Sequence, residues 1–296
     1  MENCIAKSLS GRAMAFIIDG NKIAADIRKE VKTQAMELKE KEGVVPGLAV
    51  VLVGEAPASL VYVKRKGIAC AEVGFLSREY RLPSDAKEKD LLEVIAGLNS
   101  EKEIHGILVQ LPLPIHINPD TIIEAIDFRK DVDGFHPYNM GRLLAGNPAH
   151  VACTPKGIVE LIKRSGITIE GKEAVIVGRS NIVGKPLALL LLAHHATVTV
   201  CHTRTIHLSE ITKRADILVA AVGKPEMIKA DMVKAGAVVI DVGVNRLDDG
   251  RLAGDVDFTE VAEKASYITP VPGGVGPMTI AMLLKNTLDA ARLSAK

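Results

Sequence analysis

Hydrophobic and polar positions along the chain follow two alternating patterns. Short apolar runs rich in β-branched residues, such as Leu48–Val53 and Glu173–Val177, are typical of parallel strands that are buried on both faces. Between such runs, apolar residues recur every three or four positions among charged ones, as in Lys22–Glu42, which Gly43 ends. Strands that alternate with helices in this way predict an α/β protein with a mostly parallel sheet.

The pattern is lost once, around residues 147–154, and this loss predicts a boundary between two domains. Before it, the apolar run Phe16–Ile18 starts a first α/β domain, which we assign to residues 16–150. After it, residues 151–277 are expected to form a Rossmann-like second domain with a mostly parallel sheet. Further strands are expected at 74–81, 104–109, 197–200, 217–222 and 237–242, and further helices at 59–70 (with Ser59 as N-cap), 87–99, 121–128 and 155–165.

The second domain contains a strand, a loop bounded by glycines and a helix, in that order. The loop Gly178–Gly184 follows the strand Glu173–Val177, and Pro186 stands in the first turn of an apolar helix. Backbone N–H groups and the helix dipole at such a turn can hold a phosphate, which predicts a nucleotide site. The five residues between the glycines depart from the G-x-G-x-x-G spacing, so a plain tight turn is the alternative.

The end of the next strand indicates which nucleotide binds. In a dinucleotide fold an acidic residue at this place selects NAD, whereas a cation accepts the 2′-phosphate of NADP. Here Cys201–Arg204 contains no acid. We expect Arg204 and Thr203, with Arg179 from the glycine-bounded loop, to bind that phosphate through charge-assisted hydrogen bonds. The sequence therefore favours NADP; otherwise Arg204 is only a solvated loop residue.

Two side chains four residues apart suggest chemistry in the first domain. Tyr62 and Lys66 share one face of the predicted helix 59–70. If that face is buried in a cleft, Tyr62 can pack on a flat ligand ring, and desolvation lowers the pKa of Lys66 toward values useful for proton transfer. Gln110 directly follows a predicted strand, where ligands of parallel sheets gather. Without such a cleft, Lys66 is a solvent-facing lysine beside a packed tyrosine.

Composition excludes several kinds of partner. The 37 basic and 36 acidic residues nearly cancel, so no overall field favours nucleic acid or an anionic membrane. The longest apolar run, 187–193, is too short to span a bilayer, and residues 1–15 lack the apolar core of a secretory signal. The four cysteines are scattered singly and the histidines lack ligand spacing, so we expect no metal and a reducing, cytoplasmic setting.

Eight segments, taken together, resemble the successive signatures of one enzyme family. They span about Tyr62 to Thr279 in that family's order: SLVYVKRK, VQLPLP, DVDGFHPYNMGRL, CTPKG, VGRSNIVGKP, DVGVNR, GDVDF and TPVPGGVGPMT. The family is the bifunctional methylenetetrahydrofolate dehydrogenase / methenyltetrahydrofolate cyclohydrolases. The resemblance implies NADP-dependent oxidation of 5,10-methylenetetrahydrofolate and hydrolysis of the methenyl product to 10-formyltetrahydrofolate, in one-carbon metabolism.

The resemblance also implies a site and an assembly. It implies a folate site in a cleft flanked by the two domains, formed by Tyr62, Lys66, Val109, Gln110, Leu111, Asp133, Pro272, Gly273, Gly274, Val275 and Gly276. It implies NADP held by Gly178, Arg179, Ser180, Thr203, Arg204 and the backbone near Val244. It further implies a homodimer joined through the nucleotide domains, and a last helix, 278–296, that packs back on the first domain.

The chemistry of the implied reactions gives four residues catalytic roles. Hydride loss from the one-carbon bridge leaves a resonance-stabilised cation and needs no strong base, whereas hydration needs a proton acceptor and then a donor. Lys66 is the candidate for proton transfer, and Gln110 orients its amine. Asp133 suits the paired N–H donors of the pterin ring, which Tyr62 covers.

Two other functions are consistent with the sequence. A monofunctional NAD-dependent methylenetetrahydrofolate dehydrogenase is similar in sequence but lacks hydrolysis; Lys66 with Gln110, and Arg204 in place of an acid, argue against it. A non-catalytic nucleotide-binding protein is the alternative from another class, and it would turn over neither cofactor.

Overall fold

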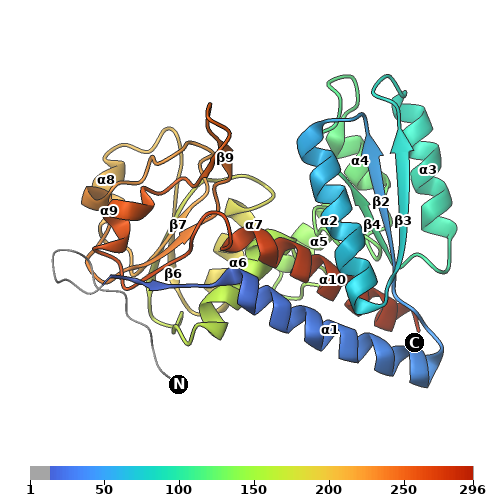
Figure 1. Cartoon of the computed structure of the whole chain (residues 1–296), viewed down its shortest axis with the longest axis horizontal. Helices are drawn as coiled ribbons and strands as arrows, with labels where there is room; N and C mark the ends of the chain where they lie inside the picture. The colour runs from blue at the N-terminus through green and yellow to red at the C-terminus, as the bar shows by residue number, and fades with distance from the viewer. Residues whose placement is uncertain (1–13, 296) are drawn as a thin grey trace. The chain divides into compact units, whose positions relative to one another are not determined.

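The computed structural model describes residues 14–295 and divides them into two compact units (Figure 1). Residues 25–153 and 280–295 form one, here called the three-stranded unit; residues 14–24 and 154–279 form the other, the six-stranded unit. The chain passes between them within helix α1 (Gly20–Glu42), after Cys153, and within helix α10 (Val275–Ser294).

The three-stranded unit is built on a short parallel sheet in the order β3-β2-β4. Its strands are β2 (Gly47–Val53), β3 (Leu76–Leu82) and β4 (Gly106–Val109). All seven residues of the central strand β2 are buried, because helices cover both of its faces. The apolar run in the sequence therefore marks a strand with no solvent-facing side.

Helices pack on this sheet through the apolar positions that the pattern indicates. On one face, α3 (Glu88–Ser100) and α4 (Pro119–Ala125) share a buried cluster with Val51 and Ile107. Helix α2 (Pro57–Val73) contacts β2 and β3, and α10 reaches β4, where a Cβ on Gly106 would lie 3.1 Å from the Thr287 hydroxyl.

The start of α2 differs from the prediction. The helix begins at Pro57, so Ser59 lies inside its first turn and is buried instead of capping it. Proline is well suited to this first position because its missing N–H would have had no helical partner. A second difference is α5 (Pro137–Leu144), a helix that the periodicity did not predict.

The six-stranded unit contains a parallel sheet in the order β1-β11-β8-β7-β5-β6. Its strands are β1 (Phe16–Ile17), β5 (Glu173–Val177), β6 (Thr197–Cys201), β7 (Ile217–Ala220), β8 (Val238–Asp241) and β11 (Tyr267–Ile268). From β5 the chain first moves outward to β6 and then returns to build the other side with β7. In such sheets ligands bind at the carboxyl ends of the strands where the order reverses, which here lies between β5 and β7.

The first strand was assigned to the wrong unit in the sequence analysis. Phe16 pairs with Tyr267 and Ile17 with Ile268, so the described residues before Ala25 belong to the six-stranded unit. Backbone bonds from Ala15 N–H to the Ala262 carbonyl and from Ile18 N–H to the Ile268 carbonyl continue the pairing. Because the partner strand β11 lies about 250 residues further along the chain, no local pattern in the sequence indicates that β1 pairs with it.

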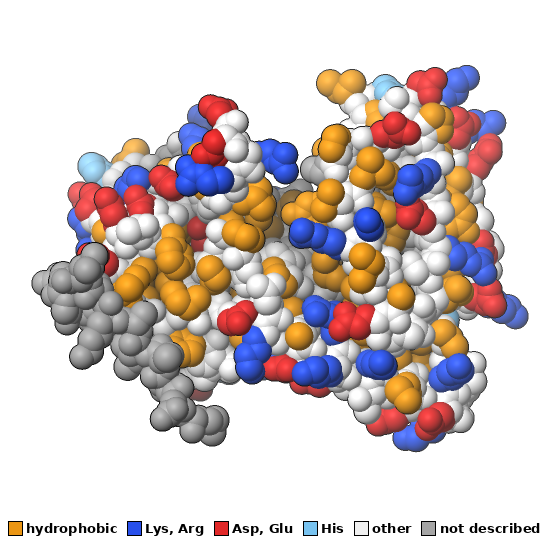
Figure 2. All heavy atoms as spheres, in the orientation of Figure 1, with side chains coloured by type: hydrophobic (Ala, Val, Ile, Leu, Met, Phe, Trp, Pro, Cys, Tyr) orange, Lys and Arg blue, Asp and Glu red, His pale blue; other side chains and the backbone are white. Residues whose placement is uncertain are grey.

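Short helices and a hairpin complete the six-stranded unit. They are α6 (Cys153–Arg164), α7 (Gly184–Ala193), α8 (Leu208–Thr212), the 3-10 turn Ala230–Met232, the hairpin strands β9 (Asn245–Arg246) and β10 (Leu252–Ala253), and α9 (Phe258–Ala262). No helix among residues 14–295 is long and apolar enough to cross a membrane. On the face drawn in Figure 2, acidic and basic side chains are interspersed.

Candidate functional site

Lys66 and Gln110 form a hydrogen-bonded pair inside the three-stranded unit. Lys66 is only 8% exposed, and its Nζ donates to Gln110 Oε1 at 2.9 Å. Gln110 directly follows β4, and its Nε2 donates to the Leu111 carbonyl at 2.7 Å. Because the amide nitrogen is engaged by Leu111, the amide oxygen must point toward the lysine. The solvent-facing alternative for Lys66 is therefore wrong.

Burial and neighbouring charges shift the pKa values of Lys66 and Asp133. Burial lowers the pKa of Lys66, and nearby Asp133 opposes this shift only in part. Burial also raises the pKa of Asp133 to about 6, against the opposing effect of Lys66, while Asp131 raises it further. The lysine thus has an increased neutral fraction at neutral pH, while Asp133 is mostly ionised there.

The expected neighbours of the lysine lie on the same elements. Tyr62 precedes Lys66 by one turn of α2 and is 40% exposed, so its ring is open to a ligand. Val109 is buried at the end of β4, and Leu111 is half-buried beside Gln110. Strand β4 and helix α2 therefore bring together most of the residues that were predicted for this unit.

The segment 131–137, which carries Asp133, looks like a polar loop in the sequence, but in the structure its first residues are packed. Asp131 and Val132 are 2% and 0% exposed. The Val132 carbonyl accepts hydrogen bonds from Asn286 Nδ2 at 2.8 Å and from the Cys153 thiol at 3.3 Å. The sequence pattern does not reveal Asp131, Cys153 and Asn286 as parts of this site. Cys153 and Asn286 contact backbone atoms far along the chain, and Asp131 binds backbone N–H groups just after it, which every sequence contains.

In the six-stranded unit, the backbone at both ends of the glycine-bounded loop packs closely against other backbone atoms. Gly178 has φ 138°, and a Cβ there would lie 2.3 Å from the Ala221 carbonyl oxygen that follows β7. A Cβ on Gly184, the first residue of α7, would lie 2.1 Å from the Gly178 carbonyl oxygen. Both positions need glycine for close backbone approach, although their spacing is unusual. Ser180 stabilises the loop by accepting the Val183 N–H at 3.1 Å.

Basic side chains lie in this loop, at the start of α7 and in the turn that follows β6. Arg179, Thr203 and Arg204 are exposed, and neither arginine has an ion pair with any residue of the described part of the chain. The Arg204 N–H donates to His202 Nδ1 at 3.2 Å, which shapes the turn after β6. Lys185, which the sequence analysis did not select, stands in the first turn of α7 and donates to Asn181 Oδ1 at 2.7 Å.

The buried carboxylates of Asp255 and Asp241 accept hydrogen bonds from the backbone of the loops that follow β7 and β8. Asp255 accepts the consecutive N–H groups of Val222, Gly223 and Lys224 at 2.6–3.0 Å. Asp241 accepts the N–H of Gly243 at 2.9 Å and so fixes the backbone that leads to the exposed Val244. Burial raises the pKa of Asp241 to about 6. The backbone N–H groups of residues 222–224 are thus already engaged by Asp255.

The glycine-rich run before the last helix also belongs to this unit up to Thr279. Gly273 has φ 105°, and its carbonyl accepts the Asn21 N–H at 3.1 Å. A Cβ on Gly20 would lie 1.9 Å from the Gly274 carbonyl oxygen. The expected loop 272–276 is shorter than predicted, because α10 already begins at Val275 and includes Gly276.

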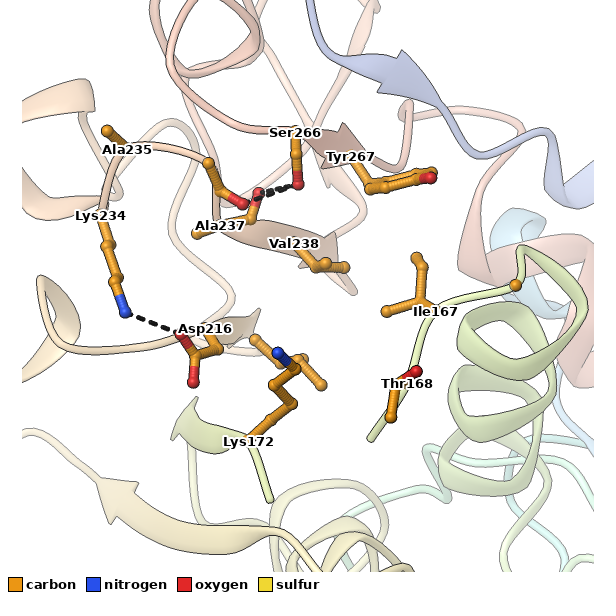
Figure 3. A pocket seen from close by; sticks show the side chains of 13 residues that line it. Ile167, Thr168, Lys172, Asp216, Lys234, Ala235, Ala237, Val238, Ser266 and Tyr267 are labelled. Atoms are coloured by element: carbon orange, nitrogen blue, oxygen red, sulfur yellow. Dashed lines mark hydrogen bonds and ion pairs between the residues drawn. The ribbon is translucent and has the colours of Figure 1, made fainter. Parts of the chain in front are cut away.

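A pocket of about 310 Å³ lies at the opposite edge of the six-stranded sheet, at the amino ends of its strands (Figure 3). Its polar side chains largely satisfy one another: Lys234 Nζ pairs with Asp216 at 2.7 Å, and the Ser266 hydroxyl donates to the Gly236 carbonyl at 2.7 Å. None of the predicted site residues lines it. Within residues 14–295, no group of three or more His, Cys, Asp or Glu side chains is arranged to hold a metal.

A parallel sheet with a cation-flanked glycine loop, and a second α/β unit with a buried lysine–glutamine pair, define a dinucleotide-binding α/β enzyme. The chain belongs to the tetrahydrofolate dehydrogenase/cyclohydrolase family. Family models match the catalytic domain over residues 18–133 and the NAD(P)-binding domain over residues 152–295.

Known relatives match almost the whole chain. Bifunctional protein FolD 2 of Geobacter metallireducens is 59% identical over 279 residues, covering 94% of this chain and 98% of its own. The crystal structure of the bifunctional FolD enzyme from Campylobacter jejuni has TM-score 0.92 and 51% identity, covering 94% of this chain and 99% of its own. The Trypanosoma brucei FolD structure, complexed with NADP cofactor and inhibitor, has TM-score 0.92 and 40% identity, covering 96% and 99%.

Proposed function

We propose that this chain oxidises 5,10-methylenetetrahydrofolate to 5,10-methenyltetrahydrofolate with NADP and hydrolyses the product to 10-formyltetrahydrofolate. The observation that carries the proposal is the buried pair of Lys66 Nζ and Gln110 Oε1, 2.9 Å apart. A reaction that only removed hydride would not need a desolvated amine with an oriented partner. The similar Geobacter and Campylobacter proteins are both named as bifunctional.

The hydrolytic step follows from the state of the Lys66 amine. Since burial lowers its pKa, a larger fraction of the amine carries a free lone pair at neutral pH. Gln110 Oε1 accepts one N–H and thereby orients that lone pair. The amine takes a proton from the water that attacks the methenyl carbon and returns it to the ring nitrogen that leaves, while the remaining hydroxyl proton of the intermediate is released to solvent as the formyl C=O forms. Gln110 does not itself gain or lose a proton.

Folate binding is proposed to depend on Asp133 and Tyr62. The Asp133 carboxylate accepts two N–H groups from the pterin edge, which gives a charge-assisted, paired contact. The exposed ring of Tyr62 stacks on the pterin face, and Val109 and Leu111 contribute apolar and backbone contacts. The Pro272–Gly274 run and the start of α10 are proposed as further contacts.

The residues at the carboxyl edge of the six-stranded sheet fit NADP. The pyrophosphate is proposed to bind at the N-terminus of α7, where the first backbone N–H groups of the helix and its dipole favour an anion. The guanidinium groups of Arg179 and Arg204, with the Thr203 hydroxyl, are proposed to hold the 2′-phosphate, and the backbone near Val244 is proposed as a further contact. When bound, the nicotinamide supplies the hydride acceptor. The protein contributes position and charge.

Three further properties belong to the same proposal. We place the enzyme in cytoplasmic one-carbon metabolism. We also propose a homodimer formed through β6, the open edge of the six-stranded sheet. On this edge Val200 is 38% exposed, and on the adjoining α7 Leu192 is 59% exposed, so apolar surface lies next to unpaired strand backbone.

A paired assay on the purified chain tests the proposal. Formation of the methenyl product is followed by absorbance with NADP and with NAD, and its hydrolysis is followed separately against the uncatalysed rate. We expect both reactions, with NADP preferred. A dehydrogenase that does not hydrolyse the methenyl product would contradict the bifunctional assignment, and a pure binding protein would turn over neither cofactor.

A further inference from the structure

Asp131 is a buried carboxylate two residues before the proposed pterin-binding Asp133. It is 2% exposed and forms a parallel bridge with Ile107 of β4. Its Oδ1 accepts the N–H groups of Gly134 and Phe135 at 3.1 and 3.2 Å. Its Oδ2 accepts the His136 N–H at 2.9 Å. One side chain therefore binds three consecutive N–H groups that follow Asp133.

Asn139 of α5 supplies the fourth donor. Its Nδ2 donates to Asp131 Oδ2 at 2.8 Å and to the Phe128 carbonyl at 2.8 Å. Asn139 is fully buried, and its Oδ1 has no hydrogen-bond partner within the described residues. Both N–H groups of the amide are therefore engaged, and one of them binds Asp131.

The backbone on either side of Asp133 is held as well. The Val132 carbonyl accepts hydrogen bonds from Asn286 and Cys153. Gly134 has φ 76°, and a Cβ there would lie 2.4 Å from the Ala152 nitrogen. Asp133 itself is thus the side chain left to face a ligand, in a segment whose other polar groups bind the protein.

We infer that Asp131 is the positioning residue for Asp133, with Asn139 holding its carboxylate in place. The four donors occupy both oxygens of Asp131, so this carboxylate is not available to substrate. It instead fixes the loop so that the two oxygens of Asp133 point together at the paired donors of the pterin. The inference rests on the proposed role of Asp133 in folate binding.

The inference is tested with Asp131→Asn in the full-length chain. The amide cannot accept at its nitrogen, so at least one loop N–H loses its partner and the loop loosens. We expect the KM for methylenetetrahydrofolate to rise at least about tenfold, while the KM for NADP changes less than about twofold. The matched control is Asp127→Asn: this nearby carboxylate binds Arg129 and not the Asp133 loop, so its folate KM should be unchanged.

A pH profile separates positioning from general damage. The charged groups that act on Asp133 are Lys66 of α2 and Asp131, and the nearby Cys153 thiol at the start of α6 lowers the pKa of Asp133 slightly. Removing the negative charge of Asp131 lowers the pKa of Asp133, so the acid limb of kcat/KM for folate should move to lower pH. Mere structural damage would lower the plateau and leave this limb in place.

Asn139→Ala is a second test, which remains informative if Asp131→Asn does not fold. Asn139→Ala keeps the carboxylate but removes one of its four donors, and we expect the folate KM to rise about three- to tenfold. An unchanged folate KM in both folded variants overturns the inference. Asp133→Asn is measured alongside: if it leaves the folate KM unchanged, the proposed role of Asp133 fails, which is a different result.

Discussion

Lys66 Nζ and Gln110 Oε1 lie 2.9 Å apart, and the Lys66 side chain is only 8% exposed. Lys66→Met keeps the length and apolar volume of the side chain but removes the amine. We expect cyclohydrolase activity to fall at least about 100-fold, because hydration needs the proton acceptor, whereas the dehydrogenase should keep a larger fraction of its rate. Both activities are measured on the same folded variant.

The control for this prediction lies on the same helix. Lys64 is exposed two residues earlier and has no hydrogen bond to Gln110. Lys64→Met should leave both activities within about twofold of the parent. If Lys66→Met hydrolyses the methenyl product at nearly the parent rate, the buried pair is structural and proton transfer occurs elsewhere.

Cofactor preference is expected to depend on Arg179 and Arg204. Replacing both by Ala should raise the KM for NADP at least about 100-fold, because each charged hydrogen bond contributes about 1.5–3 kcal/mol. The KM for NAD, which lacks the 2′-phosphate, should change little. Arg214→Ala is the matched control, since this arginine pairs with Glu173 at the amino end of β5. Equal losses for NADP and NAD would contradict the assignment.

Asp133 is expected to reduce the stability of the folded chain. Its pKa is raised from 3.8 to about 6, so the folded state binds the proton more tightly than the unfolded state does. The resulting penalty is absent below pH 3.8 and complete above pH 6. Asp133→Asn should therefore raise the free energy of unfolding by about 1–3 kcal/mol at pH 7.5 while it weakens folate binding.

Denaturant unfolding at pH 7.5 and pH 4 checks this expectation, since the gain of Asp133→Asn should largely disappear at the lower pH. Asp127→Asn provides a control of opposite sign. Arg129 lowers the pKa of Asp127 through a side-chain hydrogen bond, so this carboxylate stabilises the fold at neutral pH and its loss should destabilise. A neutral-pH loss of stability in Asp133→Asn would show that Asp133 is an ordinary structural carboxylate.

Gly178 is expected to tolerate no side chain. Gly178→Ala places a Cβ 2.3 Å from the Ala221 carbonyl oxygen at φ 138°, so we expect a loss of about 2–4 kcal/mol in stability together with weakened NADP binding. Gly141→Ala in α5 meets no atom within 4 Å and should instead stabilise by about 0.5–1 kcal/mol. Normal NADP affinity in Gly178→Ala would refute the role of this loop.

The proposed dimer is tested at the edge strand β6. Val200→Lys puts a charge on the exposed apolar side of that strand and should convert the dimer to a monomer in light-scattering measurements. Ile115→Lys is the control, because Ile115 is fully exposed and belongs to the three-stranded unit, whereas β6 belongs to the six-stranded unit. A Val200→Lys variant that keeps the parent mass would place any dimer contact elsewhere.

The sequence could predict the elements better than the long-range contacts. Strands such as β2 and β5 were found because burial on both faces produces continuous apolar runs. The four-residue spacing placed Tyr62 and Lys66 on one face of a helix, but spacing alone does not tell whether that face is buried. Only the packing of α2 on the sheet decides this.

Asp131 illustrates what local pattern cannot reveal. In the sequence it is one of several charged residues in a segment that looks like a solvated loop, yet it is buried and binds four donors. Its partners are mostly backbone N–H groups, which every sequence contains. The pairing of β1 with β11 was missed for a similar reason, because two-residue strands carry no periodicity.

The pairing of Phe16 with Tyr267 also limits when the six-stranded sheet can be completed during synthesis. Tyr267, the strand partner of Phe16, is added about 250 residues after it. The sheet β3-β2-β4, by contrast, uses residues 47–109 and can form while synthesis continues. Strand β1 must therefore remain unpaired until residues 267 and 268 have been synthesised.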